Sequence, residues 1–133
     1  MRRTSTRWGA LVLAAALSGP VAGCVAAAAA GAAGGVYATT RGAEALVAGS
    51  VDQVTARAQT VMKEMDIVPS AEKSETAGDK HQLKGKQGDL DITIDMQRSD
   101  SATTKVEVYA RKNLAEWDKA YAKEVLERIV KEE

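Results

Sequence analysis

Two stretches in the C-terminal half of the chain alternate regularly in polarity. Successive side chains of a β-strand point to opposite faces, so each stretch gives one apolar and one polar face. This one-sided alternation is typical of antiparallel sheets with one face on a core and the other in water. A turn at Arg98–Ser101 is expected to join the two strands. The positions assigned to the apolar faces are Leu90, Ile92, Ile94 and Met96, then Thr104, Val106, Val108 and Ala110.

Apolar residues at helical spacing lie before and after these strands in the sequence. Ser50 followed by Gln53 has the form of a capping box and predicts a helix start. The helix is expected to end near Asp66, because Pro69 limits it. A second helix is predicted over Leu114–Lys131, with Trp117 near its start at the edge of the core. The expected buried stripes are Val51, Val54, Ala58, Val61, Met62 and Met65 in the first helix, and Tyr121, Ala122, Val125, Leu126 and Ile129 in the second.

Three shorter segments complete the expected sheet. They are a strand at Ala43–Ala48, an extended segment over residues 67–74, and a polar strand at Lys80–Lys84. Gly85 and Gly88 are interpreted as turn residues. The element order β-α-β-β-β-β-α predicts an α+β fold of two layers, an antiparallel sheet with two helices on one face. We assign residues 43–133 to this domain and expect a thin core, because the chain has no Phe.

The N-terminus has the pattern of a bacterial lipoprotein leader. A basic segment containing Arg2, Arg3 and Arg7 precedes the apolar stretch Trp8–Leu17. Val21-Ala22-Gly23-Cys24 then resembles a lipobox, an aliphatic residue followed by two small residues and a cysteine. We therefore predict a signal peptide at residues 1–23, cleaved between Gly23 and Cys24.

Cys24 is the predicted lipidation site, and it is the only cysteine in the sequence. Its thiolate can carry a diacylglyceryl group as a thioether, and cleavage frees its amine for another acyl chain. Two or three chains anchor a protein stably, so membrane lipid is the predicted partner of acylated Cys24. An uncleaved transmembrane anchor and ordinary secretion are the alternatives, since no residue from Trp8 to Ala38 is charged.

Residues 24–42 are interpreted as a lipidated, flexible tether rich in alanine and glycine. One alternative is that this tract lies in the bilayer interface, where Gly31 and Gly35 would favour helix packing. Val25 follows the cysteine, and an aspartate there is the inner-membrane retention signal of enterobacteria-like sorting. We therefore predict a cell-envelope location on the periplasmic side of the outer membrane.

The chain also resembles a group of small bacterial lipoproteins catalogued only as a domain of unknown function. The resemblance implies an envelope location and an α+β domain, and it supplies neither an activity nor catalytic residues. The matching features are Gly23-Cys24, the Ala/Gly tract, Tyr37-x-x-x-Arg41-Gly42, the run Ala48–Val54, and the hairpins before a helix ending in Leu126-x-x-Ile129.

Little in the sequence predicts chemistry beyond Cys24. Without the three leader arginines, 15 basic residues face 18 acidic ones, a net charge of −3 that disfavours a nucleic-acid partner. His81 is the only histidine and is expected at the surface, so no metal or other cofactor is predicted. Asp91 and Asp95 are about 13 Å apart on one strand, too far for a paired-carboxylate site. Asp89 is nearer to Asp91 but is expected in a turn.

These observations predict a non-enzymatic interaction or structural module held at the membrane. The partner protein in the envelope is not identified by the sequence. A small-ligand-binding module, with a groove between the helices and the sheet, is the alternative. Ordinary packing is expected for Tyr109 and Tyr121, and Lys105 and Arg111 are expected to balance the carboxylates of the neighbouring strand.

Overall fold

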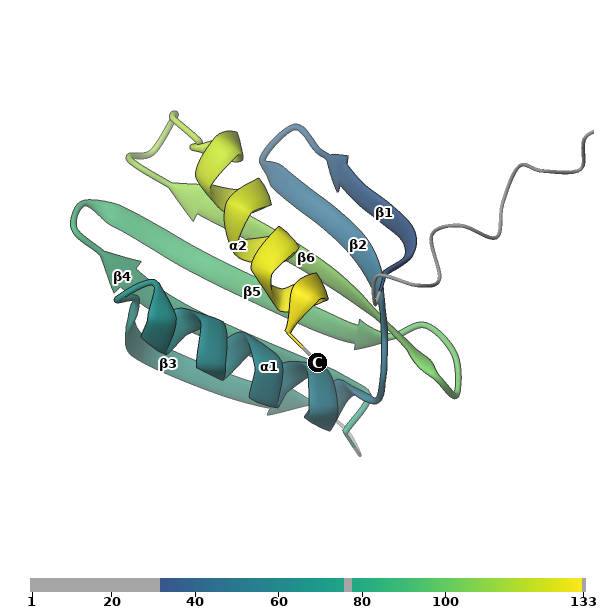
Figure 1. Ribbon diagram of the computed structural model, residues 1–133. Helices are drawn as coiled ribbons and strands as arrows, with labels where there is room; N and C mark the ends of the chain where they lie inside the picture. The colour runs from purple at the N-terminus through teal and green to yellow at the C-terminus, as the bar shows by residue number, and fades with distance from the viewer. Residues whose placement is uncertain (1–31, 76–77, 133) are drawn as a thin grey trace, which may run out of the picture.

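An antiparallel sheet forms one layer of the domain, and two helices form the other (Figure 1). The computed structural model describes residues 32–75 and 78–132, and within them it has six strands and two helices. The strand order is β1-β2-β6-β5-β4-β3, and every neighbouring pair is antiparallel. The strands are β1 (Ala32–Ala38), β2 (Gly42–Ala48), β3 (Val68–Glu75), β4 (Lys80–Gln87), β5 (Leu90–Arg98) and β6 (Thr103–Arg111). The predicted α+β class is confirmed.

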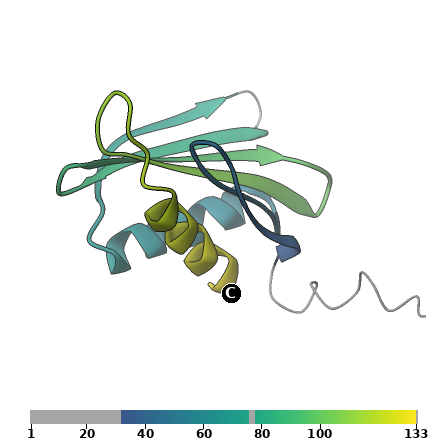
Figure 2. The ribbon, with the colours of Figure 1, turned by 90° about the horizontal axis from the view of Figure 1, so that it is seen from above.

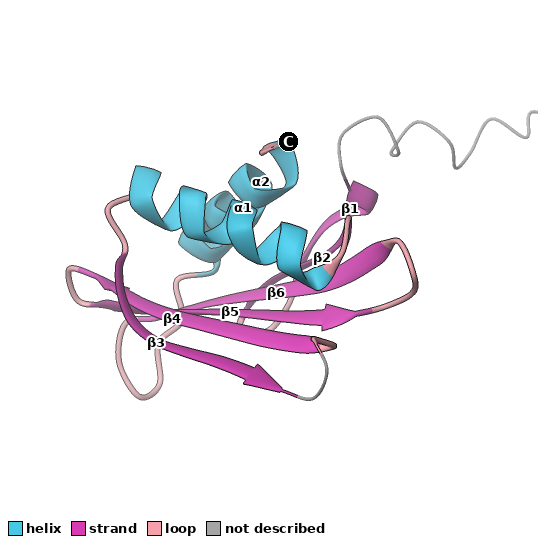
Figure 3. Ribbon diagram, turned by 90° about the horizontal axis from the view of Figure 1, so that it is seen from below, coloured by secondary structure: helices cyan, strands magenta, loops and turns pink. Residues whose placement is uncertain are grey.

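Both helices cover the same face of the sheet (Figures 2 and 3). They are α1 (Val51–Glu64) and α2 (Lys119–Lys131). Among the described residues, no helix covers the opposite face, which we call the open face (Figure 3). The predicted arrangement, two helices on one side of an antiparallel sheet, is therefore correct.

The core lies between the two layers and follows the alternation of the sequence. Ile94 of β5 and Val108 of β6 are fully buried, and they lie directly opposite each other. Val54 and Val61 of α1 and Leu126 of α2 complete the same apolar cluster. Full burial of one such side chain contributes about 1.5–3 kcal/mol, so these contacts stabilise the association of helices and sheet.

The start of α1 is set by the predicted capping box. The Ser50 side chain accepts a hydrogen bond from the Gln53 N–H, and the Gln53 side chain accepts one from the Ser50 N–H. The helix ends at Glu64, two residues before the predicted end near Asp66. Asp66 takes a left-handed backbone conformation, φ +54°, which redirects the chain into β3.

The first strand lies where the sequence predicted a tether. Ala32–Ala38 forms an edge strand, with Val36 opposite Ala45 and Ala38 opposite Ala43. The predicted tether over residues 24–42 is therefore wrong from Ala32 onward, and the sheet begins before the predicted boundary at residue 43. Alanine and glycine have low strand propensity, and here pairing with β2 outweighs it. The rest of the predicted tether lies outside the described residues.

The segment before α2 is a loop and not the predicted first turn of a helix. The Asn113 side chain accepts hydrogen bonds from the backbone N–H groups of Ala115 and Glu116. These bonds close a turn that competes with helix formation. The helix starts at Lys119 after an N-cap at Asp118, five residues later than predicted. Leu114 is consequently 91% exposed and contributes nothing to the core.

Strand β4 is longer than predicted and includes Gly85 in its interior. The assignment of Gly85 to a turn was therefore wrong, whereas Gly88 does lie in the β4–β5 turn with φ +56°. A Cβ atom at Gly85 would lie 2.6 Å from Ile67 Cγ2 and 2.7 Å from Met62 Cε. The missing side chain thus lets the end of α1 pack closely on the sheet.

Candidate functional site

The open face carries a grid of polar side chains from neighbouring strands. One row crosses it through Glu44, Glu107, Asp95 and Gln82, each directly opposite the next. Lys105 Nζ lies 3.4 Å from a Glu44 carboxylate oxygen and 3.2 Å from one of Glu107. We call these five residues the balanced row, because Lys105 pairs two of the carboxylates and Gln82 donates a hydrogen bond to the third.

Electrostatics of the balanced row follow from these contacts. The hydrogen bond to Glu107 holds the pKa of Lys105 above its ordinary value, against a smaller opposing effect of burial. Lys105 therefore stays charged throughout the neutral range and keeps the two carboxylates paired. Lys105 was predicted to balance the carboxylates of β5, but it pairs instead with Glu44 of β2 and Glu107 of its own strand.

A second cluster lies at the end of the sheet where β6 finishes. The rings of Tyr109 and Trp117 meet edge to face, with centroids 6.2 Å apart and planes at 65°. Arg41 lies over Trp117, with Cζ 5.8 Å from the ring centroid. These distances suit an aromatic pair and a cation–π contact. The three residues come from the β1–β2 turn, from β6 and from the loop before α2.

Local structure explains how the loop brings Trp117 to this place. The Lys112 N–H donates to the Glu116 carbonyl, and the Asp118 N–H donates to the Ala110 carbonyl. The chain thus folds back on the end of β6, and Trp117 forms a β-bridge with Arg111. In Figure 2 this loop rises on the side of the sheet opposite the helices. Trp117 therefore belongs to the open face, and its predicted place at the edge of the core is wrong.

Gly42 allows the close strand approach beneath this cluster. It lies opposite Tyr109, and a Cβ atom there would lie 1.9 Å from the Val108 carbonyl oxygen. Only glycine avoids that clash without moving the backbone. The Gly42 N–H donates to the Thr39 hydroxyl, which fixes the turn that carries Arg41. Turn geometry and strand pairing together set the position of Arg41.

A small hollow of about 200 Å³ lies among these side chains. We call it the aromatic hollow, and it is lined by Arg41, Lys84, Asp91, Thr93, Tyr109, Arg111 and Trp117. Its lining has three cations and one carboxylate. Asp91 lies opposite Arg111 of β6 in register, and its carboxylate is 3.3 Å from Nζ of Lys86 on the other neighbouring strand, β4. The hollow therefore has a surplus of positive charge, whereas the balanced row beside it has three carboxylates and one ammonium group.

Burial at the hollow raises the pKa of Tyr109 to about 12, with a further contribution from the Glu107 carboxylate. The phenol therefore remains protonated across the physiological range. It can donate a hydrogen bond to an incoming acceptor, and it does not act as a base near neutral pH. The hollow thus offers guanidinium, ammonium and hydroxyl donors beside two aromatic rings.

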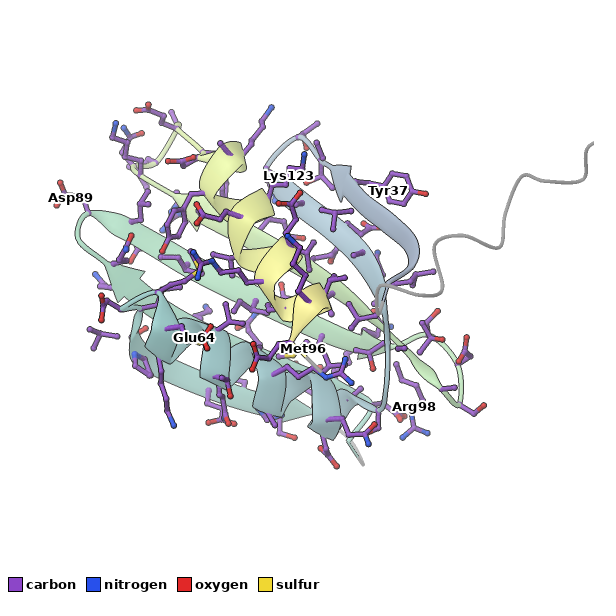
Figure 4. The ribbon with its side chains drawn as sticks, in the orientation of Figure 1. Tyr37, Glu64, Asp89, Met96, Arg98 and Lys123 are labelled. Carbon is purple, nitrogen blue, oxygen red and sulfur yellow. The ribbon has the colours of Figure 1, made fainter. Side chains whose placement is uncertain are left out.

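The other residues considered in the sequence lie elsewhere. Asp89 is at the tip of the β4–β5 turn and points away from the sheet (Figure 4). Asp91 is next to Lys86, and Asp95 belongs to the balanced row, so the three carboxylates form no common site. In the described parts of the chain, no group of three His, Cys, Asp or Glu side chains is arranged to hold a metal ion.

His81 differs from its predicted surface position. Its side chain is only 14% exposed, and Nε2 lies 2.5 Å from a Glu72 carboxylate oxygen. His81 shares the helix-side face of β4 with Leu83, which an isolated polar strand pattern does not reveal. Gly23 and Cys24, the predicted cleavage and lipidation residues, lie outside the described residues.

Sequence reasoning missed the aromatic hollow because its members are far apart in the chain. Arg41 and Trp117 are 76 positions apart, and they belong to segments predicted as tether and as helix. The available signal was the polar alternation of β5 and β6, which places Asp91 and Thr93 on the same side as Tyr109 and Arg111. That pattern gives no indication that Arg41 and Trp117 join them.

Comparison with known proteins gives no relative: no family model, no curated protein and no solved structure matches the chain. The resemblance to the lipoprotein group therefore stays a prediction. Among residues 32–75 and 78–132, neither helix has the length and apolar character needed to cross a membrane.

Proposed function

We propose that this chain is a lipoprotein of the bacterial cell envelope, anchored through acylated Cys24, whose folded domain is a non-enzymatic interaction module. One observation carries the anchor: Val21-Ala22-Gly23-Cys24 follows a basic and then apolar leader. The open sheet face supports the second half, because a face left uncovered by the chain's own helices is available to another molecule. Val25 stands where the inner-membrane retention signal would be an aspartate, and this favours the periplasmic side of the outer membrane.

The anchor is tested by replacing its nucleophile. Cys24→Ser should abolish incorporation of labelled palmitate and block cleavage of the leader, because serine cannot form the thioether. Ala22→Gly is the matched control, since it keeps a small residue before the cleavage site and should be processed normally. Labelling and processing that survive in Cys24→Ser would overturn the lipoprotein assignment.

Membrane placement is tested separately in an enterobacterial host. Val25→Asp should move the mature protein from the outer- to the inner-membrane fraction, and Val25→Ala should leave it in place. Recovery of the parent and of Val25→Ala in the inner-membrane fraction would contradict the outer-membrane assignment while leaving lipidation intact.

A small-ligand-binding function is the second candidate, favoured by a groove of about 500 Å³ between α1 and β3. Its apolar lining includes Met62, Pro69, Ala71 and Leu83. This volume lies within the range of small-molecule sites. Ala71→Lys would place a charge in the groove at an exposed position outside the core, so loss of binding to a panel of apolar fluorophores in that variant, with Gln97→Lys on the open face as the control, would support this function.

A further inference from the structure

The aromatic hollow has the composition of a protein–protein anchor point. Trp, Tyr and Arg are the residues most enriched where binding energy concentrates. Here the Trp117 ring contacts both Tyr109 and Arg41, and its backbone forms a β-bridge with Arg111. The rest of the open face consists mainly of polar and charged side chains. An interface centred on the hollow would therefore have an aromatic centre and a polar rim.

Charge indicates what kind of group the hollow takes. Among the described residues, Arg41, Lys84 and Arg111 form no ion pair, whereas Asp91 is already paired with Lys86. A guanidinium group presents a planar fork of donors that matches a carboxylate. The hollow thus lacks a negative partner, and a carboxylate would supply it.

The volume of the hollow indicates whether it binds a single side chain or a free ligand. Pockets for drug-sized molecules span about 300–1,000 Å³, and they enclose most of the ligand. The aromatic hollow holds about 200 Å³ and opens onto a broad sheet face. It therefore suits one side chain of a larger partner that also covers the surrounding strands.

Its position also bears on the partner, on the premise of the proposed anchor. The chain enters the sheet at Ala32, which pairs with Val47, while the hollow lies beyond Gly42 at the other end of these strands. Seven residues of strand separate the two ends by about 20 Å. The hollow thus lies at the end of the domain opposite the point where the anchored segment joins it, and this end is open to a protein partner.

We propose that the aromatic hollow anchors an acidic side chain from an extended segment of a partner protein. The carboxylate would lie between Arg41 and Arg111, and the methylene groups behind it would pack against Trp117 and Tyr109. Lys84 would interact with a neighbouring acidic residue of the segment. The inference deepens the proposed interaction function by naming its surface and the chemistry of the partner.

The experiment uses the full chain in a non-ionic detergent and a hexaglutamate peptide as the probe. Trp8→Phe is introduced throughout, so that Trp117 is the only tryptophan and reports on the hollow by its fluorescence. We expect saturable binding that weakens with added salt, because exposed charges are screened. Arg41→Gln with Arg111→Gln should weaken binding by about tenfold or more, the scale of a close charge pair across an interface.

The matched control removes the same charge from the same face outside the hollow. Lys73→Gln with Lys80→Gln should change the affinity by less than about twofold, since neither residue lines the hollow. Circular dichroism and thermal melting establish that both double variants remain folded. A Trp117→Phe variant, read by peptide anisotropy, separates loss of the ring's contact from loss of charge.

Three outcomes would overturn the inference. They are absence of peptide binding, equal weakening in both double variants, and a Trp117 response only to vesicles of phosphatidylglycerol and phosphatidylcholine. The last would identify a lipid headgroup as the ligand. None of these outcomes depends on lipidation, so failure here and failure of the Cys24→Ser test are distinguishable.

Discussion

The two faces of the sheet differ although they are built from the same strands. On β5, Ile92 and Ile94 point toward the helices and are at most 1% exposed. Between them, Thr93 points to the open face and is half-buried. The helix-side face is filled by side chains from α1 and α2, whereas no helix of the described residues packs on the open face and the loop before α2 reaches it at Trp117.

Because of this difference, the helix-side face determines the stability of the domain, and the open face is available for binding. Contacts on the helix side are apolar and complete within the chain, so their loss lowers the free energy of unfolding. On the open face, ion pairs among exposed side chains contribute little, typically 0–1 kcal/mol each. Substitutions there can therefore change recognition while the fold persists, which is the condition for an interaction surface.

The sharpest test of this separation compares adjacent residues of β5. Ile94→Ala should lower the free energy of unfolding by about 2–5 kcal/mol, because it removes buried methyl groups and leaves a cavity. Thr93→Ala should cost about 1 kcal/mol or less, the range of strand propensity at a half-exposed site. Urea denaturation monitored by circular dichroism measures both. Similar losses in the two variants would show that the open face is as important for folding as the core.

The sequence predicted the sheet's central strands because their alternation is strict. Burial of Ile92 and Ile94 follows directly from that pattern, as does the capping box at Ser50. Strand β1 was missed, since Ala and Gly carry no clear period and its pairing depends on β2. The start of α2 was misplaced because the turn at Asn113 competes with a helix of similar local propensity.

Prediction of the candidate site was poorer than prediction of the fold. The polar sides of β5 and β6 indicated that Asp91 and Thr93 share a face with Tyr109 and Arg111, and the sequence did not indicate the other members of the hollow. Arg41 reaches the hollow through a β1–β2 turn that was expected to be tether. Trp117 reaches it through a loop that was expected to be helix. Long-range convergence of this kind depends on strand order, which local periodicity does not specify.

A second test adds volume to the helix-side face. Gly85→Ala should lower the free energy of unfolding by about 1–3 kcal/mol, because its Cβ would crowd Ile67 and Met62. Lys86→Ala, on the open side of the same strand, should remain within about 0.5 kcal/mol of the parent. Thermal unfolding of both variants gives the comparison. A destabilised Lys86→Ala with an unchanged Gly85→Ala would reverse the roles assigned to the two faces.

A third test destabilises the start of α1, the helix that packs on the helix-side face of the sheet. Ser50→Ala removes the side-chain acceptor of the capping box and should cost about 1 kcal/mol. Thr60→Ala is the control, because Thr60 is exposed on the same helix and bonds only to the Ala56 carbonyl. Chemical denaturation should show a lower midpoint for Ser50→Ala alone. Equal midpoints would mean that the cap is dispensable once the core has formed.

The last test concerns pH dependence on the open face, an effect that is absent at neutral pH. Tyr109 has a pKa of about 12 in the fold against an ordinary value of 10, so the unfolded chain loses its phenolic proton first. Its contribution to stability is therefore complete below pH 10 and is lost as the pH rises toward 12. Absorbance of the phenolate, compared between the parent and Tyr109→Phe, should reveal one tyrosine that titrates near pH 12. The difference in unfolding free energy between the two proteins should fall over the same interval. A Tyr109 midpoint near 10 would instead mean that solvent reaches the phenol freely. The open face would then lack the partly desolvated site that distinguishes the aromatic hollow from the balanced row.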